Sequence, residues 1–137
     1  MTAPEPLLAR TIAQLLAGWD LALYDPDAPL VERSTRTDGE VPTTIQECTV
    51  ITALPTVFDG RADALYRVQV FTRRTGNLPV VQEWAHALHT RLHNTEYTPN
   101  ILGIAFASET SRLYFDPDTQ KRSAVAVTYA FRGRRAA

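Results

Sequence analysis

Three histidines on one predicted helix are the residues of this chain whose types and spacing come closest to a chemical site. His86, His89 and His93 follow at intervals of three and four residues, which places them on neighbouring helical rows. Neutral imidazoles spaced in this way can share a metal ion. The glutamate and glycine context of a metalloprotease helix is absent, and polar Gln82 and Glu83 lie beside them. The pattern therefore favours solvated surface histidines, and we predict no metal ligand and no cofactor.

Two pairs of carboxylates and one cysteine are the remaining candidates for chemistry. Asp25 and Asp27, like Asp116 and Asp118, flank a proline and could hold a divalent cation or act as acid and base. Turn chemistry explains both pairs, because proline presets the turn and aspartate accepts local backbone hydrogen bonds. Cys48 lies in an apolar alternating segment and is expected to be a small buried side chain. We predict no catalytic residue.

Charge is unevenly distributed along the 137 residues, although the net charge is only −1. Residues 1–60 contain three arginines and nine acidic residues, whereas residues 61–137 contain eleven basic and six acidic residues. A net charge near zero argues against a strong general affinity for nucleic acid. The uneven pattern suits a subunit that meets partners of different sign or copies of itself, although ordinary solvated faces also explain it. The candidate contacts to phosphates or acidic partner surfaces are Arg73, Arg74, Arg132, Arg134 and Arg135.

The clearest predicted elements are a strand and a helix in the middle of the chain. In residues 65–72 apolar and polar side chains alternate, which predicts a strand that buries Tyr66, Val68 and Val70. Asn77 can cap the helix that follows, where the apolar spacing changes to three and four. The buried stripe of this helix is predicted to be Val81, Trp84, Ala85, Leu88 and Leu92.

The remaining elements surround this unit. Thr2 and Glu5 have the spacing of a capping box, so a helix is expected to begin there and to end near Gly18. Further strands are expected at residues 44–53, 101–108, 112–115 and 123–131. Residues 31–42 are polar and contain Asp38-Gly39, so we expect a mobile loop there, and residues 132–137 are expected to form a frayed tail.

Together these expectations describe one α+β domain over residues 1–137. It is a two-layer sandwich, with a mostly antiparallel sheet of four to five strands and two helices packed on one face. Residues 1–20 are too polar for a signal peptide, and no run approaches the roughly 20 apolar residues of a membrane span. We therefore expect a protein without membrane association, made and kept in a cytosol-like compartment.

In the order of these segments and the types of residue within them, the chain resembles the tail terminator and minor capsid (tail completion) proteins of long-tailed bacteriophages. The resemblance is carried by the helix at residues 7–16, the turn at residues 59–61, the strand at residues 66–73 and the helix at residues 81–89. It implies a small α+β subunit that assembles as a hexameric ring on the end of the tail tube, stops its growth and provides the head-docking surface. The implied partners are the tail tube protein, a head-completion or neck connector protein, and genomic DNA that passes without sequence specificity.

The resemblance also implies a location and a role for charged residues. The protein would be a non-enzymatic part of the virion tail or neck, present in the host cytoplasm during assembly. The candidate arginines would face the ring lumen or a partner, or the lumen would be acidic, with Asp25, Asp27 and Glu32 nearby. Another neck or connector subunit of similar fold is the second hypothesis. A small metal-dependent enzyme that uses the three helix histidines is the third.

Overall fold

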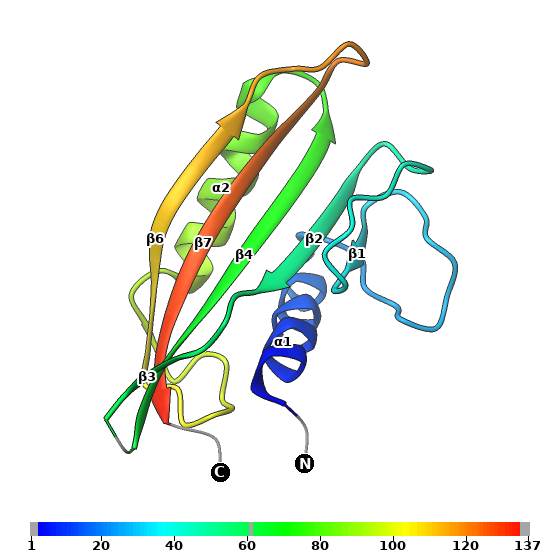
Figure 1. The fold of residues 1–137 in the computed structure, drawn as a ribbon. Helices are drawn as coiled ribbons and strands as arrows, with labels where there is room; N and C mark the ends of the chain where they lie inside the picture. The colour runs from blue at the N-terminus through cyan, green and yellow to red at the C-terminus, as the bar shows by residue number, and fades with distance from the viewer. Residues whose placement is uncertain (1–2, 61, 135–137) are drawn as a thin grey trace.

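The computed structural model of this chain describes residues 3–60 and 62–134 and consists of a twisted sheet with two helices (Figure 1). The long strands lie side by side, with one helix behind them in this view and the other below β2. In chain order the elements are α1 (Pro4–Gly18), β1 (Ser34–Arg36), β2 (Cys48–Ala53), β3 (Val57–Asp59), β4 (Asp63–Thr75), α2 (Leu78–Leu92), β5 (Thr95–Glu96), β6 (Phe106–Phe115) and β7 (Arg122–Arg134).

The sheet is larger than the sequence predicted. It has seven strands in the order β1-β2-β4-β7-β6-β5, with β3 paired to β4. The β1–β2 pair is parallel and the other pairs are antiparallel, so the sheet is mixed. The prediction of four to five strands is wrong because β1, β3 and β5 span two or three residues each, too few to show an alternating pattern. The segments expected at 101–108 and 112–115 contribute to one strand, β6, with a register shift between Glu109 and Ser111.

Both helices cover the same face of the sheet, as the sequence predicted. Tyr66, Val68 and Val70 of β4 are buried in one cluster with side chains of both helices and β7. The residues that α2 buries are those of its predicted apolar stripe. Helix α2 packs on β4, β6 and β7, and α1 packs on β2 and β4. The alternation of β4 and the stripe of α2 therefore define the two layers.

Helix α1 begins one residue later than the predicted capping box requires. The N-cap residue is Ala3, which has no side-chain cap, and Thr2 lies outside the described residues. Glu5 instead accepts a hydrogen bond from the Thr56 hydroxyl at 2.5 Å. This hydrogen bond holds the pKa of Glu5 below its ordinary value. The first turn of α1 is thus tied to the segment that leads into β3.

Two segments expected to lack regular structure contain strands. Ser34–Arg36 lies within residues 31–42 and forms β1, so the interpretation of the whole segment as a loop is wrong, while its mobility stays a prediction. Residues 132–134 complete β7 opposite residues 63–65 of β4, so they are not a frayed tail. Residues 135–137, and Arg135 with them, lie outside the described residues. Backbone pairing, which does not depend on apolar side chains, accounts for both differences.

The other face of the sheet carries neither described helix, and residues 42–46 cover part of it. The Arg73 guanidinium donates hydrogen bonds to the carbonyls of Pro42, Ile45 and Gln46 at 2.9–3.0 Å. Arg73 is the Cα partner of Cys48 in β2. Cys48 is fully buried, as the sequence predicted, and burial raises the pKa of its thiol. Arg73 therefore holds a loop over this end of the sheet.

Replacing Arg73 with alanine is expected to expose Cys48. The loss of three hydrogen bonds from a charged donor lowers the free energy of local opening by roughly 1.5 kcal/mol or more. Reaction of Cys48 with a thiol reagent should then be about tenfold faster than in the wild type, because about 1.4 kcal/mol is a tenfold change in the open population. Arg91→Ala, at an exposed position of α2, is the control and should keep the wild-type rate. Equal rates in Arg73→Ala and the control would contradict this role of Arg73.

Candidate functional site: charged clusters and the open face of the sheet

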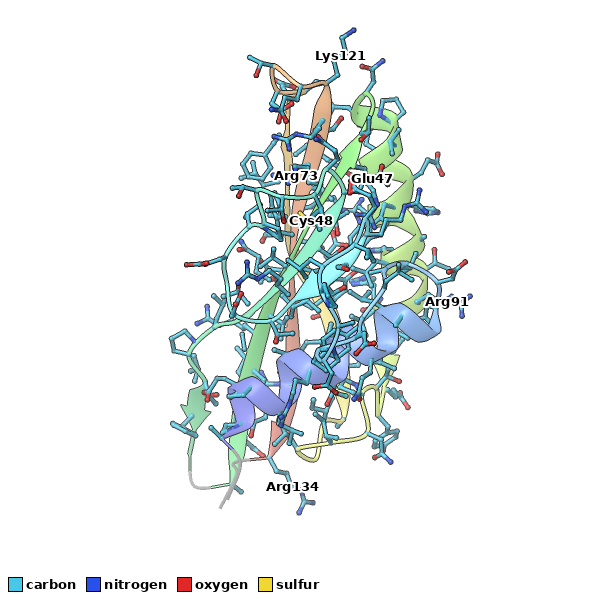
Figure 2. All side chains as sticks on the ribbon, turned by 90° about the vertical axis from the view of Figure 1, so that its right-hand side faces the viewer. Glu47, Cys48, Arg73, Arg91, Lys121 and Arg134 are labelled. Atoms are coloured by element: carbon cyan, nitrogen blue, oxygen red, sulfur yellow. The ribbon has the colours of Figure 1, made fainter. Side chains whose placement is uncertain are left out.

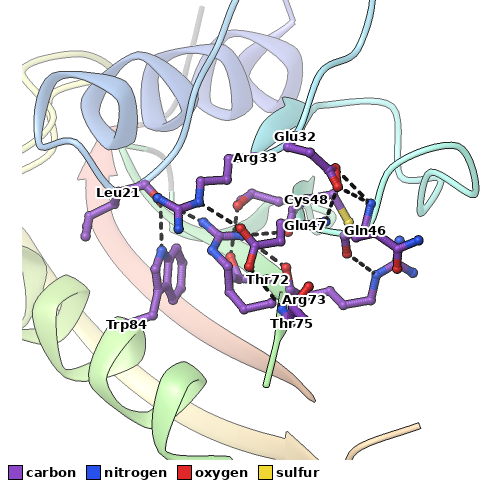
Figure 3. A network of polar contacts seen from close by, with 12 residues as sticks. Leu21, Glu32, Arg33, Gln46, Glu47, Cys48, Thr72, Arg73, Thr75 and Trp84 are labelled. Carbon is purple, nitrogen blue, oxygen red and sulfur yellow. Dashed lines mark hydrogen bonds and ion pairs between the residues drawn. The ribbon is translucent and has the colours of Figure 1, made fainter. Parts of the chain in front are cut away.

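Arg74 lies on the helix-covered face of β4 and is only 4% exposed. Its guanidinium donates hydrogen bonds to the carbonyls of Leu21, Cys48 and Arg73 at 3.0–3.3 Å. It also lies 5.9 Å from the ring centroid of Trp84, whose indole N–H donates to the Leu21 carbonyl at 2.8 Å. Figure 3 shows Trp84 directed at Leu21 beside this network. Arg74 thus joins β4, β2, α2 and the segment after α1, and it does not reach the surface as a lumen contact would.

Glu47 holds the neighbouring end of β2 in place (Figure 3). Its carboxylate accepts hydrogen bonds from Arg33 Nε at 2.8 Å and from the Thr75 backbone N–H at 3.0 Å. Burial raises the pKa of this carboxyl, but the hydrogen bonds from Arg33 and Thr75 outweigh burial and hold it below its ordinary value. The Arg33 N–H also donates to the Glu47 carbonyl at 2.7 Å. These contacts fasten the chain before β1 to β2.

The predicted histidine cluster is divided by the structure. His89 Nδ1 lies 3.0 Å from a Glu109 carboxylate oxygen, and His93 Nδ1 accepts the Glu109 backbone N–H at 2.9 Å. The two imidazole rings are stacked with centroids 4.3 Å apart. His86 is exposed. Within residues 3–60 and 62–134, no group of three or more side chains is arranged to hold a metal ion.

Glu109 is the centre of a polar cluster that the sequence did not predict. Arg112 donates to both of its carboxylate oxygens at 2.7 and 3.0 Å, and the Tyr129 hydroxyl lies 3.3 Å from one of them. Burial raises the pKa of Glu109, but the hydrogen bonds from Arg112 and His89 hold it below its ordinary value. The bulge between Glu109 and Ser111 lets residues three apart share this face, so simple alternation could not have revealed the cluster.

Replacing Glu109 with glutamine is expected to reduce stability near neutral pH by about 1–2 kcal/mol. Because the folded pKa of Glu109 lies below its ordinary 4.5, the unfolded chain binds a proton first as pH falls. The stabilisation is therefore complete above about pH 4.5 and is lost as pH falls through the folded pKa. Urea unfolding from pH 7 to pH 3 should show the difference between wild type and Glu109→Gln shrinking with acid. Glu83→Gln, at an exposed position, is the control, and a pH-independent difference for Glu109→Gln would contradict this assignment.

Two further candidate arginines, Arg132 and Arg134, lie at one end of the molecule. Arg132 and Arg134 are exposed near the end of β7, and Figure 2 shows Arg134 and Lys121 at opposite ends. The Arg134 N–H donates to the Leu102 carbonyl at 2.8 Å. The structure thus separates the five predicted arginines: Arg73 and Arg74 hold backbone carbonyls, Arg132 and Arg134 lie at the end of β7, and Arg135 is outside the described residues.

The face of the sheet that carries neither described helix, here called the open face, also has exposed apolar side chains. On β6, Leu113 is 59% exposed and Phe115 is 42% exposed. Both pair in register with alanines of β7, Ala126 and Ala124. The outer edge of β6 is paired by β5 only at Phe106 and Ala107, so within the described residues its longer part has no neighbouring strand. A long open edge next to apolar side chains is typical of a surface that pairs with another chain.

A surface pocket of about 350 Å³ lies at the opposite edge of the sheet, beside β1. Asp25 and Asp38 line it together with Arg36, and Arg36 is paired with Asp38 at 2.5 Å. Asp25 accepts the backbone N–H of Asp27 at 3.1 Å, which confirms the predicted turn chemistry of this pair. The complete lining is Tyr24, Asp25, Pro26, Ala28, Leu30, Thr35, Arg36, Thr37 and Asp38.

The fold of this chain is similar to that of a chain in the virion of a native gene transfer agent (GTA) particle. The TM-score is 0.56 at 11% sequence identity, over 96% of this chain and 92% of that chain. No protein-family model matches the sequence, and no curated protein matches it. At this level of identity the likeness establishes a shared fold. Neither described helix is long and apolar enough to span a membrane.

Proposed function

We propose that this protein is a structural virion protein that caps the end of a tail tube as a hexameric ring, stops tube growth and provides the head-docking surface. The observation that carries the proposal is the fold likeness, over nearly the full length of both chains, to a component of a gene transfer agent virion, which is a phage-like particle. The sequence resemblance to tail terminator and tail completion proteins supports the same class of function.

The proposed mechanism is capping by geometry and requires no catalysis. One face of the ring fits the last ring of the tube, and the other face does not reproduce that surface, so the addition of tube protein stops. Such a subunit needs lateral surfaces for its own copies and axial surfaces for other proteins. The open edge of β6 and its exposed Leu113 and Phe115 support a role in such contacts.

The proposed partners are further copies of the chain, the tail tube protein, a head-completion or neck connector protein and genomic DNA in passage. Contacts with DNA would be independent of sequence and sensitive to salt. Arg132 and Arg134 remain candidates for lumen or partner contacts, and Arg135 stays a sequence-based prediction. Arg73 and Arg74 are weaker candidates, because their guanidinium groups are occupied by backbone carbonyls. The protein would reside in the virion tail or neck, and in the host cytoplasm during assembly.

A tube-growth assay tests the capping function. Purified tube protein is polymerised with and without the full-length chain, and tube lengths are measured by negative-stain electron microscopy. We expect growth to stop at one tube end, with a ring visible there, at a few copies of this chain per tube. Tubes that elongate equally with a large excess of the chain would contradict the proposal.

Another neck or connector subunit is the second candidate, because the fold likeness to a virion component fits that position as well. A pull-down with the tagged chain separates the two functions. Binding to tube protein supports the terminator, whereas binding to portal-side components alone supports the connector.

A further inference from the structure

The ring of His93 takes the place of a strand neighbour at the outer edge of β6. Strand β5 pairs with β6 at Thr95 and Ala107, and the same antiparallel register places His93 opposite Glu109, two residues along each chain. The His93 backbone does not continue the ladder, because its N–H donates to the His89 carbonyl at 2.9 Å. The His93 ring accepts the Glu109 N–H instead, with Nδ1 at 2.9 Å. A side chain therefore caps the edge of β6 at this point.

This hydrogen bond determines which nitrogen of His93 carries a proton. A backbone N–H can only donate, so Nδ1 of His93 must present its lone pair to the Glu109 N–H. The ring is then neutral, and its single N–H is at Nε2. A proton added to Nδ1 would turn the acceptor into a second donor that faces the Glu109 N–H. Protonation of His93 and this hydrogen bond therefore exclude each other.

His89 responds to a proton in the opposite way. Its Nδ1 lies 3.0 Å from the Glu109 carboxylate, so it can donate to that carboxylate both as a neutral ring and as a cation. The rings of His89 and His93 are stacked with their centroids 4.3 Å apart. Two cations at this distance would repel each other. Only one of the two stacked rings can thus take a proton and keep its hydrogen bond.

The other titratable and charged groups of this cluster do not change charge near neutral pH. Arg112 donates to both oxygens of the Glu109 carboxylate, and the Tyr129 hydroxyl lies 3.3 Å from one of them. Burial raises the pKa of Glu109, but the hydrogen bonds from Arg112 and His89 hold it below its ordinary value of 4.5. Burial raises the pKa of Tyr129. A change of charge in this cluster between about pH 8 and about pH 5 therefore belongs to its histidines.

We propose that His93 is a proton-sensitive cap on the outer edge of β6, closed while its ring is neutral and released when the ring takes a proton. An opened chain leaves Nδ1 free to bind a proton, so acid favours the released form. Beyond Glu109, residues 110–115 of β6 have no neighbouring strand on this side within the described residues. Release adds the Glu109 N–H to this open edge, which extends the surface that can pair with another chain. This control of the edge does not require that the chain forms a ring.

Nuclear magnetic resonance of the ¹⁵N-labelled full-length chain tests the cap without any substitution. Long-range ¹H–¹⁵N spectra report which ring nitrogen of each histidine carries a proton. At about pH 8 we expect the His93 proton on Nε2 and a scalar coupling, through the N–H···N hydrogen bond, between the Glu109 amide nitrogen and His93 Nδ1. At about pH 5 the coupling should be lost as the ring becomes a cation. A proton on Nδ1 of neutral His93, or a coupling of unchanged size in acid, would overturn the proposal.

His93→Asn separates the hydrogen bond from the proton. The side-chain oxygen of asparagine can accept the Glu109 N–H, but it does not titrate. Hydrogen exchange of the Glu109 amide, relative to its intrinsic rate at each pH, measures how often the cap opens. Between about pH 8 and about pH 5 the wild type should lose about tenfold in protection, and His93→Asn less than about twofold. An equal loss in the two chains would overturn His93 as the sensor.

The other two histidines of α2 provide matched controls. His86 is exposed, so His86→Asn should lose protection of the Glu109 amide in acid as the wild type does. His89→Asn removes the stacked ring but keeps His93, so its Glu109 amide should also lose protection in acid. A loss that persists in His93→Asn and disappears in His89→Asn would assign the response to His89 and overturn the cap.

Discussion

Replacing Arg74 with alanine is expected to destabilise the fold by about 3 kcal/mol, because the change leaves a hole and unpaired carbonyls in a buried position. The carbonyls of Leu21 and Cys48 lose their charged donor, and Trp84 loses the cation beside its ring. Urea unfolding measures the effect, and the transition midpoint should fall while its slope stays unchanged.

Two further variants show whether the position or the charge matters. Arg74→Lys keeps the charge but lacks the planar fork, so its stability should lie between those of the wild type and Arg74→Ala. Arg91→Ala removes an exposed arginine and should stay within about 0.5 kcal/mol of the wild type. If Arg74→Ala were as stable as Arg91→Ala, Arg74 would not be a structural residue and a surface role would have to be reconsidered.

Replacing Gly133 with alanine is expected to destabilise the fold by about 2–3 kcal/mol through overpacking. A methyl group there would lie 2.8 Å from the Leu102 carbonyl oxygen and 3.1 Å from the Tyr66 ring. The backbone oxygen cannot move aside as the end of a flexible side chain can, so β7 or the segment around Leu102 must shift. Thermal unfolding followed by circular dichroism measures the loss.

Gly18→Ala is the matched control for this substitution. Gly18 is the last residue of α1, and an added methyl group meets nothing within 4 Å. Alanine is also the better helix former, so the melting temperature should be unchanged or slightly higher. Equal losses from the two substitutions would show that the close approach at Gly133 does not limit stability.

The parts of the fold that the sequence predicted well are those in which side-chain burial repeats regularly. The alternation of β4 and the stripe of α2 each extend over several residues, and the structure buries the residues that these patterns name. The placement of both helices on one face follows from these patterns, because each element hides one side. Burial of Cys48 follows from its apolar surroundings in the same way.

The parts that the sequence did not predict depend on contacts between distant residues. Strand β1 is three residues long and is defined by pairing with β2, whose first residue comes 14 positions after Ser34 in the register. The sequence named Arg73 and Arg74 together as candidate partner contacts, but neighbours on a strand point to opposite faces, and each holds a different set of carbonyls. The Glu109 cluster depends on a β-bulge, and no local pattern of side chains in the sequence predicts that bulge.

A resemblance in the order of elements concerns the fold, and the likeness to the gene transfer agent virion chain also concerns the fold. Which surfaces meet a tube, a connector or another copy depends on a few exposed side chains. The pocket beside β1 and the open edge of β6 are the surfaces that the structure adds to the sequence-based hypothesis.

The mass of the assembled protein tests the central claim most directly. Native mass spectrometry and light scattering are applied to the full-length chain alone and after incubation with polymerised tube protein. We expect a closed species of six times the 15.3 kDa subunit mass, either in solution or on the tube end. A chain that remains a monomer in both samples would contradict the account.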